Sequence, residues 1–264
     1  MTNQPEGLPR SADPAQVNDY DGFAEAYSAE NENSLVTRTT SGPRCWPSPE
    51  TWPAVGSWTP EGQIRFGPGY SRPVLRIESP IATARLTLRP FLPADSEDVY
   101  DYQRRPEVAR FMRWEPRGPQ DVRVAVEQMA RETELASDGD CLSLAVVEPG
   151  TGTVVGQVEL VLLSAEHLQG ELGCVFHPAH QGKGFATEAA LAVLGLGFGA
   201  LGLHRVIGRC HAANTASAGL LERVGMRREA RFVGTEFFKG AWRDDLVYAM
   251  LREEWPDRGR AAAT

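Results

Sequence analysis

The sequence predicts an α/β protein with a mixed, mainly antiparallel sheet flanked by helices and preceded by an N-terminal extension. From residue 84 onward, segments with apolar residues at every second position alternate with segments whose apolar residues recur every three or four positions. Short turn sequences, Pro149-Gly150-Thr151-Gly152 and Lys239-Gly240, join neighbouring segments of the first kind, as in antiparallel hairpins. Residues 1–16 and 45–60 lack either period, and the second stretch is crowded with Pro and Trp. We therefore expect residues 1–80 to form no domain, residues 84–255 to form one, and residues 256–264 to be a tail.

The elements of that domain can be assigned in order. Residues 84–91 alternate apolar and polar side chains and predict the first strand, and Asp95 is placed to cap the helix after it. Further strands are expected at residues 142–148, 153–163, 170–177, 203–210, 228–238 and 244–251. Helices are expected at residues 95–103, 107–113, 119–136, 189–201 and 214–224. Gly202 and Gly225 end the last two of these helices, so the order of elements gives a sheet of mixed direction.

Composition narrows the class of function. The 264 residues carry a formal net charge of −8, which argues against nucleic acid as a partner. The 4 cysteines form no C-x-x-C pair, as in a reduced cytoplasmic protein without a zinc site. No apolar run approaches the ~20 residues that a membrane helix needs, and the N-terminus lacks a secretory signal. We expect a cytoplasmic protein with no membrane partner and no metal.

A glycine-rich stretch, Gln181-Gly182-Lys183-Gly184-Phe185-Ala186-Thr187, lies between a predicted strand and a predicted helix. A chain that turns through small residues into a helix directs backbone N–H groups and the positive end of the helix dipole at one place, which favours a phosphate ligand. The two glycines permit a tight turn and the close approach of a diphosphate, and Lys183 adds positive charge. The stretch matches neither the dinucleotide fingerprint nor the nucleotide triphosphatase loop.

Gln181, Gly184 and Ala186 fit the Q/R-x-x-G-x-G/A loop of the GNAT superfamily of N-acetyltransferases, which the sequence resembles. Three segments in the right order are similar to the branch that acetylates the N-termini of ribosomal proteins: G-C-V-F-H-P-A-H-Q-G-K-G-F-A-T-E-A, N-T-A-S-A-G-L-L-E-R-V-G-M and W-R-D-D-L-V-Y-A-M-L. The resemblance covers residues 84–255. It implies an enzyme that transfers acetyl from acetyl-CoA to a primary amine by direct attack in a ternary complex.

The resemblance also assigns roles to residues. It implies that backbone amides hold the diphosphate of acetyl-CoA at Gln181, Gly182, Lys183, Gly184, Phe185, Ala186 and Thr187. The backbone of Cys174, Val175 and Phe176 would pair with the pantetheine arm like an added strand, and an amide there would polarise the thioester carbonyl. Asn214 would bond the pantetheine, Ser217 would lie near the sulfur, and Arg223 would meet an outer phosphate. Asn214 also suits a helix cap and Arg223 a solvated position, so both have ordinary roles open to them.

The proton-transfer groups are less defined. Many members of the superfamily place a tyrosine seven residues after the asparagine to protonate the leaving thiolate, and here that position is Leu221, so Ser217 is the nearest candidate acid. An α-amine of pKa ~8 needs only a weak base at pH 7, whereas a lysine-like amine of pKa ~10.4 must lose a proton at a cost of about 4.6 kcal/mol. Glu171 is the first candidate for the base and Glu159 the second; either is also an ordinary strand carboxylate. His177 and His180 are expected to be loop residues on the phosphate side.

The N-terminal extension has its own resemblance. Residues 18–36 are similar to the start of class I S-adenosylmethionine-dependent methyltransferases, but the glycine motif that should follow is missing. Read one nucleotide out of register, residues 45–60 are compatible with the continuation of such a domain. Residues 18–60 are therefore interpreted as a frameshifted methyltransferase remnant without a methyl-donor site.

Several alternatives stay open at this point. The chain could be a non-catalytic acyl-CoA-binding sensor or scaffold with the same fold. The acceptor could be a peptide N-terminus, an amino acid, a polyamine or an aminoglycoside, because its pocket is expected from residues 95–136 and the final hairpin, which carry no diagnostic motif. The protein could be a monomer or a homodimer.

Overall fold

The structure is a computed structural model that describes residues 64–66 and 73–255. The expectations for residues 1–63, including the methyltransferase-like segment at 18–60, and for the tail at 256–264 lie outside the described residues. No helix in the described part is long and apolar enough to cross a bilayer.

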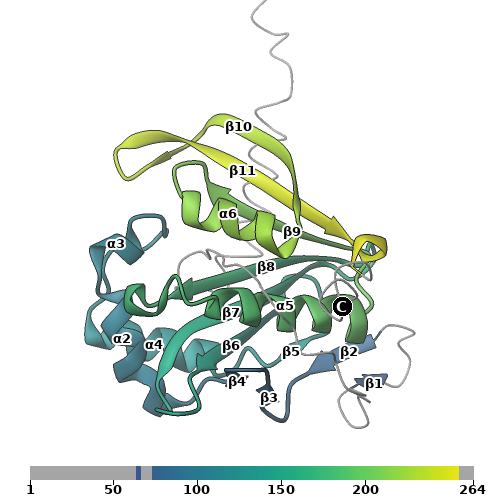
Figure 1. Cartoon of the computed structure of the whole chain (residues 1–264), viewed down its shortest axis with the longest axis horizontal. Coiled ribbons are helices and arrows are strands. Elements are labelled where there is room, and N and C mark those ends of the chain that lie inside the picture. The colour runs from purple at the N-terminus through teal and green to yellow at the C-terminus, as the bar shows by residue number, and fades with distance from the viewer. Residues whose placement is uncertain (1–63, 67–72, 256–264) are drawn as a thin grey trace, which may run out of the picture. The chain divides into compact units, whose positions relative to one another are not determined.

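The main element of this part is an eight-stranded sheet with the order β10-β11-β9-β8-β7-β6-β4-β3 (Figure 1). All neighbouring strands run antiparallel except β8 and β9, which are parallel. The strands are β3 (Ile81–Ala82), β4 (Thr87–Pro90), β6 (Cys141–Val147), β7 (Val154–Ser164), β8 (Gln169–Phe176), β9 (Arg205–His211), β10 (Arg227–Phe238) and β11 (Ala241–Leu251). This arrangement confirms the predicted mixed, mainly antiparallel sheet.

Helices cover both faces of the sheet. On one face, α5 (Phe185–Gly195), a π-helical turn (Leu196–Ala200) and α6 (Thr215–Val224) enclose the larger hydrophobic cluster. On the other, α2 (Ser96–Gln103) and α4 (Pro119–Met129) enclose a second cluster, and α3 (Pro106–Ala109) lies beside them. Alternation along β8 places Leu172 and Cys174 in the first cluster and Val175 in the second. We call these sides the α5–α6 face and the α2–α4 face.

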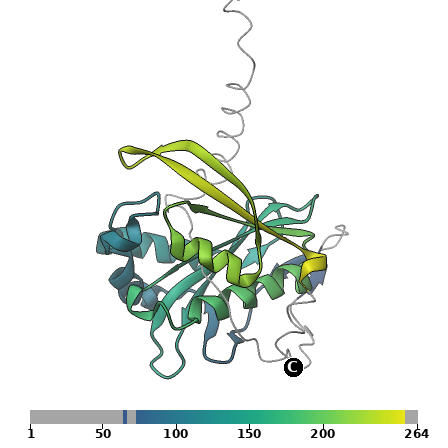
Figure 2. The same ribbon diagram turned by 45° about the horizontal axis from the view of Figure 1, so that its top comes forward.

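The hairpin of β10 and β11 extends past the body of the sheet and lies above α6 (Figures 1 and 2). Its outer part carries exposed aromatic side chains, including Phe237 and Trp242, which stack edge to face on each other. The predicted Lys239-Gly240 turn closes the hairpin, with both residues at positive φ.

Five details differ from the sequence prediction, the last of them at Asp95. A small sheet of β1 (Ile64–Phe66), β2 (Pro73–Arg76) and β5 (Glu134–Leu135) pairs across distant parts of the chain, which no local pattern indicates. Leu75 and Ile77 are buried in the larger core cluster, so the packed structure begins before residue 84 and includes part of the expected extension. Helix α4 ends at Met129 rather than near 136, and α3 is a single turn.

The side chain of Asp95 does not cap α2. Its carboxylate pairs with the guanidinium of Arg89 and accepts the backbone N–H of Leu92 (2.7 Å), because a buried carboxylate is better satisfied by a cation than by a helix terminus alone.

The parallel pair β8–β9 parts after a short contact. Pairing is limited to Gln169 with Arg205, Gly170 with Val206 and Glu171 with Ile207. Beyond Glu171 the two strands diverge, so the sheet opens toward the end of β8. Helix α5 begins just after this opening, on the chain that leaves β8.

Candidate active site

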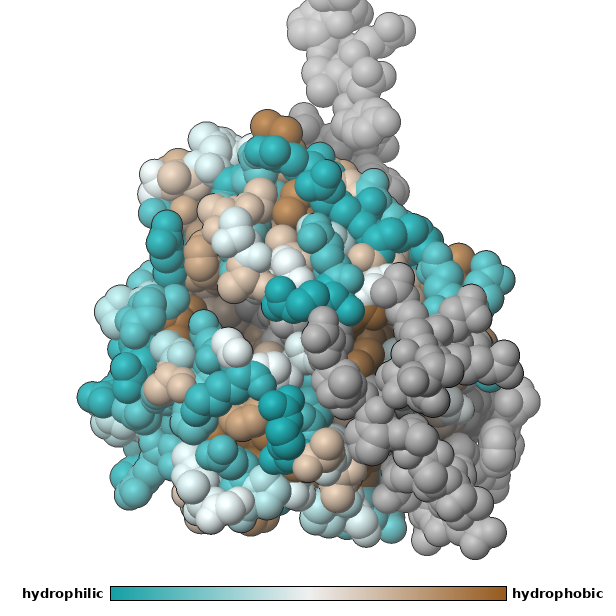
Figure 3. Space-filling view, viewed as in Figure 1, coloured by the Kyte–Doolittle hydropathy of each residue, from teal (hydrophilic) through white to brown (hydrophobic). Residues whose placement is uncertain are grey.

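A cleft of about 550 Å³ lies at the opening between β8 and β9. Figure 3 shows this region hollowed between the part that carries the hairpin and α6 and the part that carries α5. Four stretches line it: the end of β8, the loop into α5, the first turns of α6, and the segment at and after α3. The residues are Cys174, Val175, Phe176, His180, Gln181, Gly182, Gly184, Phe185, Ala186, Thr187, Asn214, Ala216, Ser217, Leu220, Arg223, Glu107, Val108, Phe111 and Met112.

The loop into α5 has the geometry that the glycines predicted. Gly182 and Gly184 have φ values of 74° and 77°, a left-handed region that other residues enter at a cost. Gly184 immediately precedes α5, and no side chain caps the helix. The first N–H groups of α5 therefore have no helical acceptor and meet the cleft at Phe185, Ala186 and Thr187. Lys183 is the one residue of the predicted loop set that does not line the cleft.

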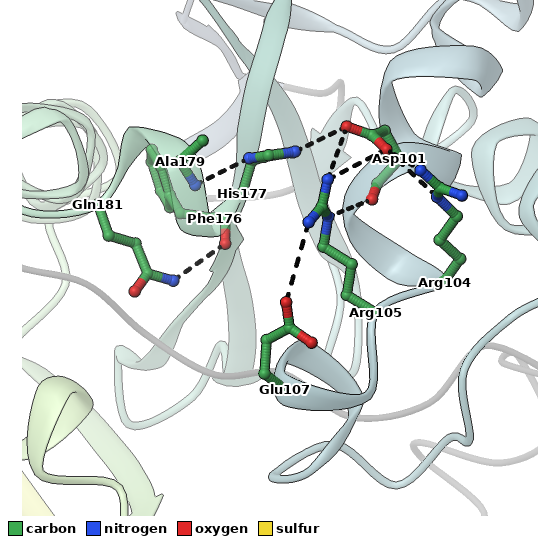
Figure 4. A network of polar contacts seen from close by, with 8 residues as sticks. All are labelled: Asp101, Arg104, Arg105, Glu107, Phe176, His177, Ala179 and Gln181. Carbon is green, nitrogen blue, oxygen red and sulfur yellow. Dashed lines mark hydrogen bonds and ion pairs between the residues drawn. The ribbon is translucent and has the colours of Figure 1, made fainter.

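Polar contacts fix the entry to this loop (Figure 4). The N–H of Ala179 donates to Nδ1 of His177 (3.0 Å), so the ring proton of the neutral imidazole is on Nε2, which donates to Asp101 of α2 (2.8 Å). The side-chain amide of Gln181 donates to the carbonyl oxygen of Phe176 (3.2 Å). Hydrogen bonds from Arg104 and then from His177 hold the pKa of Asp101 well below its ordinary value. These contacts tie the end of β8 and the start of the loop to α2.

His180 lies closer to the site than the sequence suggested. Its ring stacks on Phe185 with 6.4 Å between centroids and lines the cleft. Burial, and after it the positive charge of Lys183, lowers the pKa of His180, so the ring is neutral at pH 7.

The start of α6 supplies polar groups to the cleft, in addition to those of the loop into α5. Oδ1 of Asn214 accepts the N–H of Ser217 (3.1 Å), which is the predicted cap, and the side-chain NH₂ of Asn214 is a donor that the cap does not use. Ser217 is buried and lines the cleft. Leu221, at the position where many relatives carry a tyrosine, is fully buried and packs against Gly208 of β9. Its side chain is directed into the core.

The two candidate bases stand on the α2–α4 face beside the cleft and do not line it. Glu159 on β7 is paired with Gly173 on β8, and Glu171 lies two residues before that glycine. Both oxygens of Glu171 accept hydrogen bonds from the guanidinium of Arg209 (2.6 and 3.2 Å), across the point where β8 and β9 part. Glu171 is therefore held by an ion pair.

Glu159 belongs to a different set of contacts. Its Oε1 accepts a hydrogen bond from Nε2 of Gln157 (3.0 Å), and Oε1 of Gln157 accepts from the hydroxyl of Tyr102 (3.0 Å) and from Gln103 (3.0 Å). Burial, followed by the charges of Cys174 and Glu159, raises the pKa of Tyr102 well above its ordinary value. Tyr102 therefore stays a hydrogen-bond donor next to Glu159 and the end of β8.

The hairpin reaches across to the segment after α3. The ammonium of Lys239 donates to the carbonyl oxygens of Ala109 (3.1 Å) and Trp114 (2.8 Å) and pairs with Glu115 (3.0 Å). Arg113 pairs with Glu236 of β10 (2.7 Å). The same segment lines the cleft through Phe111, which contacts the ring of His211 on β9. The hairpin is thus tied directly to residues 109–115, part of which lines the cleft.

The comparison with known proteins identifies the family. Residues 85–227 match the family model of the acetyltransferase (GNAT) domain. The chain belongs to the GNAT family of N-acetyltransferases. This acetyltransferase is 34% identical over 176 residues to the N-acetyltransferase YnaD of Bacillus subtilis, an alignment that covers 66% of this chain and 98% of the relative.

Two further relatives bear on the site. A GNAT acetyltransferase structure from Bacillus anthracis is 32% identical with a TM-score of 0.60, covering 67% of this chain and 100% of that one. Spermidine N(1)-acetyltransferase of Vibrio cholerae is 29% identical over 113 residues, which is 43% of this chain and 65% of the relative. The matches support the acetyltransferase assignment; they do not single out the branch that acts on ribosomal proteins.

The far wall of the cleft lies within residues 95–136, where the acceptor pocket was expected. No motif marks its individual residues, and only the folded chain brings Glu107, Val108, Phe111 and Met112 into one cleft with α6. Tyr102 and Gln157 were not singled out from the sequence, because the burial that makes a polar side chain require a partner is visible only in the folded chain.

Proposed function

We propose that this acetyltransferase takes its acetyl group from acetyl-CoA and transfers it to a primary amine by direct attack in a ternary complex. One observation carries the proposal: a single cleft joins the end of β8, the uncapped start of α5 and the polar start of α6. The family uses acetyl-CoA as co-substrate, and this cleft offers complementary groups to the phosphates and the pantetheine of that molecule.

The donor fits in two sections. The diphosphate would accept hydrogen bonds from the loop and the first turn of α5, where two glycines leave room for it. The pantetheine would lie along Cys174, Val175 and Phe176 like an added strand, since β9 has diverged from β8 there. Asn214 would donate to the pantetheine, and Arg223 would meet an outer phosphate.

In the reaction, the amine nitrogen attacks the thioester carbonyl carbon. A backbone N–H at the end of β8 would stabilise the developing oxyanion. The amine proton passes through water to a carboxylate on the α2–α4 face, since neither candidate lines the cleft. The carbon–sulfur bond breaks, and the thiolate takes a proton by way of Ser217. Glu159 is favoured over Glu171 as the base, because Glu171 would have to give up its ion pair with Arg209 to accept a proton.

We propose a primary amine as the acceptor. A protein N-terminus of pKa ~8 is partly neutral at pH 7 and needs only a weak base to remove its proton, whereas the amines of a polyamine such as spermidine are mostly protonated at that pH. The similarity to the spermidine enzyme and the sequence resemblance to the ribosomal-protein branch put both on the test panel.

The test combines binding and turnover. Titration calorimetry with CoA is expected to give saturable binding, and thiol release is then measured with acetyl-CoA and a panel of spermidine, free amino acids, an aminoglycoside and peptides beginning with Ser or Ala. Amine-dependent thiol release with a matching acetylated product supports the proposal. Absence of CoA binding overturns it.

The alternative is an acyl-CoA sensor without turnover. Leu221 at the tyrosine position and the ion-paired Glu171 are the observations in its favour. Tight binding of acetyl-CoA with no amine-dependent thiol release across the panel would select this alternative.

A further inference from the structure

A buried carboxylate lies in the turn that is proposed to bind the diphosphate. Glu188, in the first turn of α5, is 2% exposed. A carboxylate there benefits from the helix dipole but repels an anionic ligand unless its charge is neutralised. Its Oε1 accepts hydrogen bonds from the hydroxyl of Thr83 (2.5 Å) and the backbone N–H of Arg85 (2.6 Å), and its Oε2 accepts one from Nε of Arg85 (2.8 Å).

Arg85 uses its remaining guanidinium on the loop. Its Nη1 donates to the backbone carbonyl of Lys183 (2.8 Å), and the guanidinium carbon lies 5.2 Å from the centre of the Phe185 ring. A Cβ on Gly184 would be 3.2 Å from Nη2 of the same arginine. One side chain, about one hundred positions earlier in the sequence, thus contacts the loop, the residue that begins α5 and the acid in its first turn.

The contact with Lys183 fixes the orientation of a peptide unit. In a trans peptide the carbonyl of residue 183 and the N–H of residue 184 point in opposite directions. Arg85 holds the carbonyl on its own side, and Arg85 does not line the cleft whereas Gly184 does. The N–H of Gly184 is therefore turned away from Arg85.

We propose that Arg85 is a positioning residue for the diphosphate. It neutralises Glu188 and holds the Lys183–Gly184 peptide so that the Gly184 N–H joins those of the first turn of α5 as a ready anion site. This role rests on the proposed use of acetyl-CoA. It predicts that loss of Arg85 weakens contacts with the diphosphate and leaves contacts with the pantetheine and the acceptor unchanged.

The test separates these two halves of the donor. In Arg85→Gln the dissociation constant of CoA, measured by calorimetry, is expected to rise about 10-fold or more. A change of this size is typical when a hydrogen bond to a charged group is lost, here the bond from the Gly184 N–H to the diphosphate. The KM for acetyl-CoA should rise with it at nearly constant kcat. With S-acetyl-pantetheine, which lacks the diphosphate, kcat/KM should stay within about twofold of the unmodified protein.

Two further variants guard against loss of folding. The double variant Arg85→Gln with Glu188→Gln removes both charges and avoids a buried unpaired carboxylate, and it should fold while still binding CoA weakly. Arg89→Gln is the matched control: Arg89 is nearby in the chain and bonds a buried carboxylate, Asp95, and a carbonyl, that of Pro90, but touches no part of the loop. It should bind CoA normally.

The outcomes are distinct. If the unmodified protein binds no CoA, the proposed donor and this role are both overturned. If it binds CoA and both Arg85 variants bind equally well, the role of Arg85 alone is overturned. An equal loss with acetyl-CoA and S-acetyl-pantetheine also overturns it, since general disruption would act on both.

Discussion

At the scale of single residues, the two candidate bases differ in what already binds them. Glu171 is held by Arg209 through both oxygens, and Glu159 is held by the neutral amide of Gln157. A carboxylate that joins two strands through an ion pair with an arginine stabilises the sheet. Removing that carboxylate is destabilising, because the arginine loses the partner that offsets its desolvation. Glu159 lies directly opposite Gly173 on the neighbouring strand, and its Oε1 accepts a hydrogen bond from the neutral side-chain amide of Gln157.

The first prediction concerns this pair. Glu159→Gln keeps the hydrogen bond with Gln157 and should lower kcat/KM about 100-fold, with the loss of the ionisation in the acidic limb of the pH–rate profile. Glu171→Gln should lower the unfolding midpoint while retaining most of kcat and the shape of the profile. The measurements are pH–rate profiles and thermal melts of both variants. A profile that changes only in Glu171→Gln would reverse the assignment.

The second prediction concerns the leaving thiolate. Leu221 packs on Gly208 in the core, so the nearest hydroxyl in this wall of the cleft is that of Ser217. Ser217→Ala should lower kcat about 10-fold or more at an unchanged dissociation constant for CoA, because the thiolate loses its proton route. Thr215→Ala, an exposed position at the start of the same helix, is the control and should leave both constants alone. An unchanged kcat in Ser217→Ala would remove Ser217 from the mechanism.

The limits of sequence reasoning are visible at this scale. The left-handed turn at Gly182 and Gly184 and the cap formed by Asn214 agree with the sequence, because a turn and a helix cap depend on neighbours in sequence. The contacts of Arg85 with Glu188 could not be predicted, since the two residues are 103 positions apart and each looks like an ordinary surface charge. Pairing between distant charges is a product of the fold.

At the scale of elements, the order of strands and helices along the chain and the hairpins followed from the sequence because period-two patterns and turns are local. The divergence of β8 from β9 did not, although it creates the cleft. The parallel pairing begins with Gln169 and Arg205 and ends after three residue pairs, and the two strands diverge from there. Nothing in the amino-acid pattern of either strand marks that point.

The hairpin gives the third prediction. Lys239, together with the ion pair between Arg113 and Glu236, ties the hairpin to residues 109–115, so Lys239→Met should loosen this segment beside the cleft. The KM for the amine should rise several-fold while the dissociation constant of CoA stays the same, because the donor contacts lie elsewhere. Arg231→Met, which breaks an exposed ion pair with Asp244 on the same hairpin, is the control. A rise in the CoA dissociation constant in Lys239→Met would contradict this division of the site.

At the scale of the whole domain, the two parts of the sheet are joined at β8 and β9 by few contacts. The pairs from Gln169 to Glu171 and the ion pair between Glu171 and Arg209 connect these strands. The remaining connections are made by helices that pack on the sheet, chiefly the contact of α5 with α6 and the shared hydrophobic cluster. A ligand in the cleft would touch both parts at once.

The fourth prediction follows from that position. A ligand that binds only the folded state raises the free energy of unfolding, by about 2.7 kcal/mol at one hundred times its dissociation constant. For a domain of this size that corresponds to a rise in the melting temperature of about 5–10 °C. CoA should produce this shift, and pantetheine at the same concentration should produce much less, because it reaches β8 and α6 but not the start of α5. Since Glu171 and Arg209 hold the same junction, Glu171→Gln should melt at a lower temperature without ligand. At the same CoA concentration it should also gain less than the unmodified protein, because CoA must then order the junction as it binds and so binds more weakly. Equal gains at the same CoA concentration would mean that the two proteins bind CoA equally tightly and that the junction between β8 and β9 is not what the ligand reinforces.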